Sequence, residues 1–271
     1  MTKQYWQDSV TIKQAKYMAA QALGDIRYMY RYHSENNQVY SFHDSENRFW
    51  IMKIAGKEDY QRDGLLTEIT CVRQLKKLGL PVADIFYTHE DITDAVQLFF
   101  IMPYLGKATR SWEHKPKILA KIMKASGRFV KLLSEIDGEC FTSGVLMDKK
   151  TTLEYFNAEC RDNTAYLKSN GLWNDAVKNC MDWAGEMYNR ELFIGQSQAS
   201  EPLIDSDGNI HFIDFEGGLN YTHPLKSLEC ITHYVEDEKE YTIAKKALID
   251  GFYGDNAGDF EEEWTRWRQY K

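Results

Sequence analysis

The 271-residue sequence lacks several features that would assign a protein to a broad class. It has no apolar run near the roughly 18–20 residues that a membrane-spanning helix needs, and its N-terminus does not have the charged-then-apolar pattern of a leader. Positive charge is also in deficit, because the net charge is −8. A general nucleic-acid-binding surface is normally basic. We therefore expect neither a membrane nor a nucleic acid as a partner.

Paired cysteines and metal-binding histidines are missing as well. With no C-x-x-C motif and no leader, the scattered cysteines predict reduced, buried thiols in a cytoplasmic protein. The seven histidines show no metal-ligand spacing. Ser197 is not part of a Gly-x-Ser-x-Gly motif, so a hydrolase triad has no support. The five cysteines are Cys71, Cys140, Cys160, Cys180 and Cys230.

The N-terminal third has the pattern of a small β-rich region. Two short apolar stretches separated by a polar turn indicate a β-hairpin, and an amphipathic stretch that stops at Gly79 indicates a helix after it. The expected elements are a helix over 11–23, strands over 39–42 and 49–54, and a helix over 64–78.

One lysine and one glutamate stand out in this region. Lys53 lies inside the second strand, between Met52 and Ile54, and Glu68 lies on the second turn of the following helix. Taken alone, Lys53 is explained equally well as a strand lysine whose ammonium reaches solvent. A role can be assigned to Lys53 and Glu68 only together with a motif further along the chain, which is described below.

The remainder is mostly helical after two more strands. The second of these strands, over 96–105, ends at Gly106, and the chain then turns helical for a long stretch. The expected elements are strands over 82–87 and 96–105, followed by helices over 117–136, 153–167, 174–188, 225–234 and 241–253.

A second predicted hairpin interrupts the helices. Leu203 and Ile204 form a short apolar strand, residues 205–208 carry turn chemistry, and residues 210–213 form the return strand. Asp214 closes that strand shortly before Gly-Gly. The backbone leaves the core at this position, so an acidic side chain there can face a ligand.

The stretch 193–218 resembles the catalytic and metal loops of the aminoglycoside phosphotransferase and choline kinase family, relatives of the protein kinases. The family pattern is His-Gly-Asp, four residues, Asn, a hairpin, and then Ile-Asp-Phe/Trp-Asp/Glu. Gly195 and Asp214–Glu216 match this pattern. Ile194, Gln196 and Glu201 stand at the positions of the family's His, catalytic Asp and metal-binding Asn. The resemblance implies a kinase-like fold with an altered catalytic loop.

The resemblance implies an α+β fold of two lobes, a small β-rich N-lobe and a larger, mostly helical C-lobe. The N-lobe would span 1–102 and the hinge 103–106. The C-lobe would span 107–271 and carry the hairpin 193–218 with the catalytic and metal loops.

The same resemblance assigns roles to the residues of the N-lobe. Lys53 and Glu68 would form the ion pair that presents an ammonium to the α- and β-phosphates of ATP or another nucleotide. The family's glycine-rich loop is replaced by 32–38, which has no glycine but contains Asn and Ser as turn formers and side-chain donors.

At the expected hinge, next to Met102, backbone N–H and C=O groups near Pro103 to Leu105 would read the adenine edge. Pro103 has no N–H, so the donor would be Tyr104 or Leu105. A plain core strand followed by a turn is the alternative for this segment.

A magnesium ion, or manganese, is the implied metal cofactor. Asp214, Glu216 and Glu201 supply the hard oxygen ligands that such ions prefer. Gln196 cannot accept a proton as a catalytic aspartate does, although its carbonyl can orient a hydroxyl. General-base catalysis is typically worth about 10²–10⁴-fold in rate.

Two functions are consistent with these residues. The first is an ATP-dependent phosphotransferase acting on an unknown small hydroxylated or amino substrate. In it, Glu201 or Asp205 would stand in for the missing base, or the substrate would need none. The second is an inactive pseudokinase that serves as a nucleotide sensor or scaffold. Acidic runs at 236–238 and 261–263 would suit a cationic substrate such as an aminoglycoside, although exposed helix faces are commonly charged.

Overall fold

The computed structural model describes two compact units of the chain. One comprises Met1–Lys107 with Leu203–Glu216, here called the N-terminal unit, and the other comprises Ala108–Pro202 with Gly217–Lys271, here called the helical unit. The lobe boundaries expected from the sequence stay a prediction. The described residues are 10–32, 34, 37–91, 97–106, 116–142, 144–190, 192–195, 201–223, 227–228, 231, 235, 237–254 and 265.

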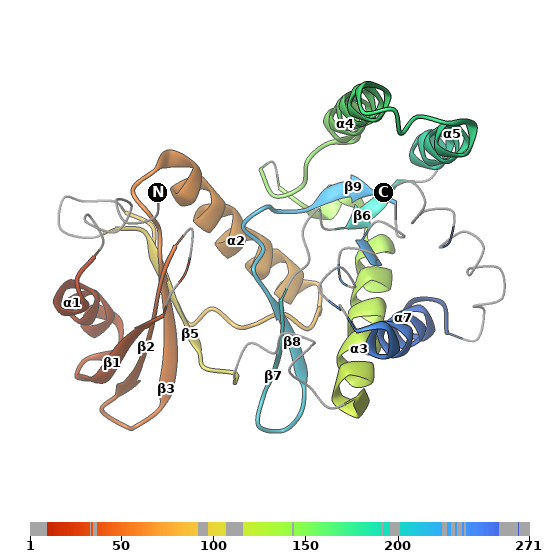
Figure 1. Ribbon diagram of the computed structural model, residues 1–271. Helices are drawn as coiled ribbons and strands as arrows, with labels where there is room; N and C mark the ends of the chain where they lie inside the picture. Colours follow the sequence, from red (N-terminus) through yellow and green to blue (C-terminus); the bar gives the residue numbers. More distant parts are fainter. Residues whose placement is uncertain are drawn as a thin grey trace. The chain divides into compact units, whose positions relative to one another are not determined.

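A five-stranded antiparallel sheet forms the N-terminal unit (Figure 1), and its strands follow the order β1-β2-β3-β5-β4. The strands are β1 (Ile26–Tyr32), β2 (Gln38–Asp44), β3 (Phe49–Ile54), β4 (Tyr87–His89) and β5 (Phe99–Pro103).

Two of these strands differ from the sequence-based expectation. The strand expected over 82–87 is wrong, because Val82 makes only an isolated bridge and β4 begins at Tyr87. β1 was not predicted at all. It is an edge strand whose tyrosines, such as Tyr30, are exposed, so it lacks the apolar pattern of a buried strand. The predicted strands over 39–42 and 49–54 are present as β2 and β3.

The two faces of the sheet pack against different helices, α1 (Ile12–Leu23) and α2 (Asp59–Lys77), as Figure 1 shows. Side chains along a strand alternate between the faces. Met52 of β3 is buried in the cluster that includes α1, whereas Ile51 packs with the cluster that includes α2. Lys53, two positions after Ile51, therefore projects toward α2.

The β2–β3 turn is organised by the buried carboxylate of Asp44. Its Oδ1 accepts hydrogen bonds from the N–H groups of Glu46 at 3.0 Å and Arg48 at 2.9 Å, and its Oδ2 accepts one from Trp50 Nε1 at 2.9 Å. Burial opposes the charge of this carboxylate, but the hydrogen bonds outweigh it and lower the pKa of Asp44 to about 2. The turn fixes the register that places Lys53 on the α2 face.

The second predicted hairpin is present as β7 (Glu201–Ile204) and β8 (Ile210–Ile213). β8 is joined to the segment after α2 by backbone hydrogen bonds. The Phe212 N–H donates to the Pro81 oxygen at 2.8 Å, and the Ala83 N–H donates to the Phe212 oxygen at 3.1 Å. These bonds place the end of β8, and thus the residues that follow it, in the N-terminal unit.

The helical unit contains most of the helices predicted from periodicity. The helix expected over 225–234 lies largely outside the described residues, and the three-residue strands β6 and β9 were too short to predict. The described elements are α3 (Pro116–Ser134), the short 3-10 helix Gly138–Cys140, α4 (Lys149–Ser169), α5 (Asp175–Arg190), β6 (Phe193–Gly195), β9 (Asn220–Thr222) and α7 (Glu238–Tyr253).

No helix in the described part of the chain has both the length and the apolar character of a membrane span. Among the described side chains, Cys71, Cys140 and Cys160 form no disulfide. Cys71 is buried as expected, whereas Cys140 is exposed, so the prediction of a buried thiol is wrong there.

Helices α3 and α7 pack with their backbones in contact, and this leads to a stability prediction. A Cβ added at Gly127 would lie 2.1 Å from the Leu248 carbonyl oxygen. Gly127→Ala should therefore destabilise the helical unit by about 1–3 kcal/mol, although alanine is the better helix former. Gly185 of α5 is the matched control, since a Cβ there meets no atom of the described residues within 4 Å. Gly185→Ala should stabilise by about 0.5–1 kcal/mol.

Denaturant unfolding of both variants measures the two effects. Equal stabilities for Gly127→Ala and Gly185→Ala would show that the helix backbones do not approach as described.

Candidate functional site

The Lys53 ammonium lies among three carboxylates in the N-terminal unit. Its Nζ is 2.7 Å from Glu68 Oε2 and 3.2 Å from Asp214 Oδ1, and it also contacts Glu216 Oε1. The ion pair expected between Lys53 and Glu68 is present. The structure thus brings together four residues from three separate stretches of the sequence.

Each of these side chains is placed by its own element. Lys53 comes from β3, Glu68 from the buried face of α2, and Asp214 from the residue after β8. Asp214 adopts a left-handed conformation with φ 71°, which an L-residue rarely takes. Glu68 Oε1 accepts a hydrogen bond from the Asp214 N–H at 3.2 Å, which helps to hold that conformation. Glu68 therefore braces both Lys53 and the backbone after β8.

The electrostatics of the cluster keep Lys53 charged. Burial opposes the charge of the ammonium, but the carboxylates of Glu68, Asp214 and Glu216 outweigh it and raise the pKa of Lys53 above its ordinary value. Burial also raises the pKa of Glu68, and the lysine offsets part of that effect. When all three acids are ionised they exceed the single ammonium by two negative charges, so the site favours an additional cation.

The carboxylate oxygens fit a divalent cation. Ligand atoms of Glu68, Asp214 and Glu216 lie within 4.8 Å of one another. Glu68 is the weakest ligand of the three, because Lys53 occupies its Oε2 and the Asp214 N–H occupies its Oε1. In the described part of the chain, no donor contacts Asp214 Oδ2 or Glu216 Oε2. Carboxylate oxygens are the ligands that Mg²⁺ and Mn²⁺ prefer, so these two oxygens suit such an ion.

At the expected hinge, one of the two candidate donors is already used. The Tyr104 N–H donates to the Phe49 carbonyl oxygen at 2.9 Å, and the two rings lie 4.2 Å apart. Among the described residues no acceptor contacts the Leu105 N–H. The Met102 side chain is buried in the cluster between sheet and α2, and Leu105 packs against that cluster.

The stretch expected to form the catalytic loop is described only at its ends. Ile194 and Gly195 belong to β6, and a Cβ at Gly195 would lie 2.6 Å from Ser227 Oγ. A side chain at this position would therefore require the Thr222 and Ser227 side chains to shift. Gln196 lies outside the described residues. Glu201 begins β7, but its side chain also lies outside them.

Asn37 is a site residue that sequence reasoning missed. Its side chain is buried, and its Nδ2 donates to Glu216 Oε1 at 2.5 Å. From the sequence, residues 32–38 were interpreted only as a polar stretch that replaces a glycine-rich loop. A polar residue just before a strand is too common a pattern to single out Asn37.

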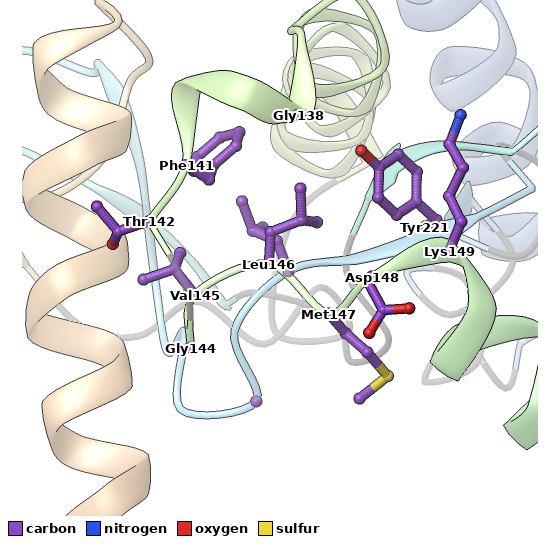
Figure 2. A pocket seen from close by; sticks show the side chains of 12 residues that line it. Gly138, Phe141, Thr142, Gly144, Val145, Leu146, Met147, Asp148, Lys149 and Tyr221 are labelled. Atoms are coloured by element: carbon purple, nitrogen blue, oxygen red, sulfur yellow. The ribbon is translucent and has the colours of Figure 1, made fainter.

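The helical unit holds a separate cavity of about 660 Å³ (Figure 2). Apolar and aromatic side chains such as Phe141, Leu146 and Tyr221 line it, together with Asp148 and Lys149 at the start of α4. The Lys149 Nζ lies 4.8 Å from the centre of the Tyr221 ring. The volume is in the range of small-molecule sites.

Comparison with solved structures finds the same fold in antibiotic phosphotransferases. The streptomycin–ATP complex of the aminoglycoside phosphotransferase APH(2″)-IIa has a TM-score of 0.62 at 15% identity, over 97% of this chain and 89% of that one. Macrolide 2′-phosphotransferase MphH from Brachybacterium faecium has a TM-score of 0.59 at 13% identity, over 92% and 87%. ADP-bound APH(2″)-Ib has a TM-score of 0.52 at 14% identity, over 96% and 97%.

At these identities the likeness shows the fold alone, and it confirms the expected protein kinase-like α+β fold. A scan against protein-family models found no match, and a search of curated proteins found none either.

Proposed function

We propose that this protein is a phosphotransferase that binds ATP with a magnesium or manganese ion and phosphorylates a hydroxyl of a small molecule. One observation carries the proposal. The ion pair of Lys53 and Glu68 stands beside one carboxylate oxygen each of Asp214 and Glu216 that no described donor contacts, in a kinase-like fold. Two of the structural neighbours are named as ATP and ADP complexes, which supports a nucleotide as the ligand.

Each residue of the cluster has a distinct role in this proposal. Lys53 supplies a fixed positive charge to the phosphates, and Glu68 holds its ammonium in place. Asp214 Oδ2 and Glu216 Oε2 would hold the metal ion, which supplies charge neutralisation when bound. The Leu105 N–H is the donor for the edge of the base, because the Tyr104 N–H is bound to the protein.

We propose Glu201 as the acid that stands in for the missing catalytic base. Gln196 cannot accept a proton. Asp205 is unsuited, because its carboxylate accepts hydrogen bonds from the Asn209 N–H at 2.8 Å and bonds His211 Nε2 at 2.9 Å. The contact with His211, followed by those with Asn209, holds the pKa of Asp205 below its usual range.

ATP and reduced thiols are both found in the cytoplasm, which is the location we propose for this protein.

A nucleotide sensor without phosphoryl transfer is the second candidate. It is favoured by Ile194 and Gln196 in the catalytic loop and by His223, which precedes a proline where the family commonly has Asp-Pro. His223 is buried, and burial lowers its pKa to about 4. It is therefore neutral at pH 7 and does not replace the charge of an aspartate.

We assign the acceptor to the cavity of Figure 2. Gly217 lines that cavity and is joined by one peptide bond to Glu216 of the proposed metal loop. The rings of Phe141 and Tyr221 suit an apolar body, and Asp148 suits an amine. Hydrogen bonds from Thr151 hold the pKa of Asp148 below its usual value, so this carboxylate is charged at pH 7. The acceptor class is thus an amphipathic molecule that carries a hydroxyl and a basic group.

A phosphorylation panel tests the proposal. The protein is incubated with radiolabelled ATP, Mg²⁺ or Mn²⁺, and a set of aminoglycosides, macrolides, choline-like alcohols and sugars. We expect labelled product with at least one amphipathic amine, and none from Asp214→Ala. Binding of nucleotide without any product across the panel would favour the sensor.

Leu146→Trp tests whether the acceptor binds in the cavity, independently of the nucleotide. The larger side chain should fill the cavity and raise the KM for the acceptor by at least about tenfold, with the Kd for ATP unchanged. An unchanged KM would mean that the acceptor binds elsewhere.

A further inference from the structure

Two donors converge on a single oxygen of Glu216. Lys53 Nζ contacts Oε1 of this carboxylate, and Asn37 Nδ2 donates to the same atom at 2.5 Å. The other oxygen, Oε2, contacts no donor among the described residues. A carboxylate bound through one oxygen only is oriented, because rotation about its last bond would break both contacts. Its second oxygen is then directed by the protein.

Asn37 is itself fixed in place. Its side chain is 2% exposed, and its Oδ1 accepts a hydrogen bond from the Gly56 N–H at 3.3 Å. Both ends of the amide are therefore used, one by the backbone after β3 and one by Glu216. Lys53 differs from Asn37, because it has a long flexible stem and shares its charge among three acids. Asn37 is the more specific of the two restraints on Glu216.

This arrangement joins two stretches that are far apart in the sequence. Asn37 ends the polar stretch 32–38 and precedes β2, and Glu216 follows Asp214 after β8. In kinases a glycine-rich loop lies where this chain has residues 32–38, and it covers the phosphates of the nucleotide. Here the same stretch holds a buried side-chain amide that reaches the metal loop instead.

We propose that Asn37 is a positioning residue for the metal site, which holds Glu216 by Oε1 so that Oε2 is presented to a divalent cation. Residues that orient a metal ligand typically change metal affinity by about 10–100-fold when they are replaced. The proposal rests on the proposed function only in requiring that nucleotide and metal bind together. It adds a residue that neither the sequence motif nor the fold points to.

A double-mutant cycle with a binding readout tests this inference. The Kd for ADP is measured by calorimetry with and without Mn²⁺ for the native chain, Asn37→Ala, Glu216→Ala and the double variant. The Kd without Mn²⁺ divided by the Kd with Mn²⁺ measures how strongly metal and nucleotide favour each other's binding. Asn37→Ala should lower this ratio by about tenfold. The Kd for ADP without metal should change by less than about twofold, because Lys53 and Glu68 remain.

The double variant separates positioning from a general structural effect. If Asn37 acts through Glu216, adding Asn37→Ala to Glu216→Ala should lower the ratio no further. Asn37→Ser, whose hydroxyl can still donate, should recover part of the ratio and serves as the second variant if Asn37→Ala folds poorly. Asn209→Ala is the matched control, because its amide donates to Asp205 and not to the cluster. It should leave the ratio unchanged.

Two results would overturn the inference. An unchanged ratio in Asn37→Ala, or losses that add in the double variant, would show that Asn37 does not act through Glu216. A native chain that binds ADP equally with and without Mn²⁺ would remove the metal site itself, and the proposed function would fail at the same step. The ADP titrations of the native chain therefore show whether the proposed function fails. The titrations of the variants show whether only the inference about Asn37 fails.

Discussion

Lys53→Met should destabilise the N-terminal unit by about 3–5 kcal/mol, the usual cost of leaving a buried charge without its partner. Glu68 is almost fully buried beside Lys53 and would be the uncompensated charge. Because the pKa of Lys53 is raised, its contribution is complete at neutral pH and is lost only as pH rises above the ordinary lysine value of about 10.5. In Lys53→Met the loss should shrink as pH falls, because Glu68 then becomes protonated.

Denaturant unfolding combined with amide hydrogen exchange in β3 measures this change and assigns it to the N-terminal unit. The matched control is the double variant Lys53→Met/Glu68→Met, in which the buried pair is replaced by apolar side chains of similar size. It should be more stable than Lys53→Met alone. If Lys53→Met unfolds with the native free energy, the ammonium is not buried among these acids.

Gln196→Asp should raise the rate of phosphoryl transfer, or of ATP hydrolysis, by about 10²–10⁴-fold. The substitution restores a carboxylate at the position where the family has its catalytic base. The Kd for ATP should stay the same, because the proposed roles in binding nucleotide and metal belong to Lys53, Glu68, Asp214 and Glu216, which the substitution leaves in place. The rate is measured by single-turnover transfer from radiolabelled ATP.

Gln196→Glu and Ser197→Asp are the controls for that experiment. The first supplies a longer carboxylate at the same position, and the second supplies one at the next position, so neither should match Gln196→Asp. A rate for Gln196→Asp that is equal to the native rate would mean that this loop does not hold the reacting hydroxyl.

The sequence alone could predict the part of the site that depends on regular elements. The alternation of β3 and the periodicity of α2 are strong patterns, and together with the family motif they led to Lys53, Glu68 and Asp214. The helices α3, α4, α5 and α7 were also predicted, because their apolar residues recur at helical spacing.

What could not be predicted depends on contacts between distant residues or on weak local patterns. The edge strand β1 has exposed tyrosines instead of an apolar face, and β6 and β9 have only three residues each. Asn37 meets Glu216 across 179 positions, and no local pattern encodes such a pair. The choice between Tyr104 and Leu105 needed the hydrogen bond from Tyr104 to Phe49.

Thermal unfolding with nucleotide and metal tests the central claim most directly. The native chain and Asp214→Ala are compared with ATP, ADP and GTP, each with and without Mg²⁺ or Mn²⁺. Nucleotide at 100 times its Kd should stabilise the native chain by about 2.7 kcal/mol in the presence of metal. Asp214→Ala should lose most of this gain. No shift of the native chain with any nucleotide and metal would contradict both the transferase and the sensor.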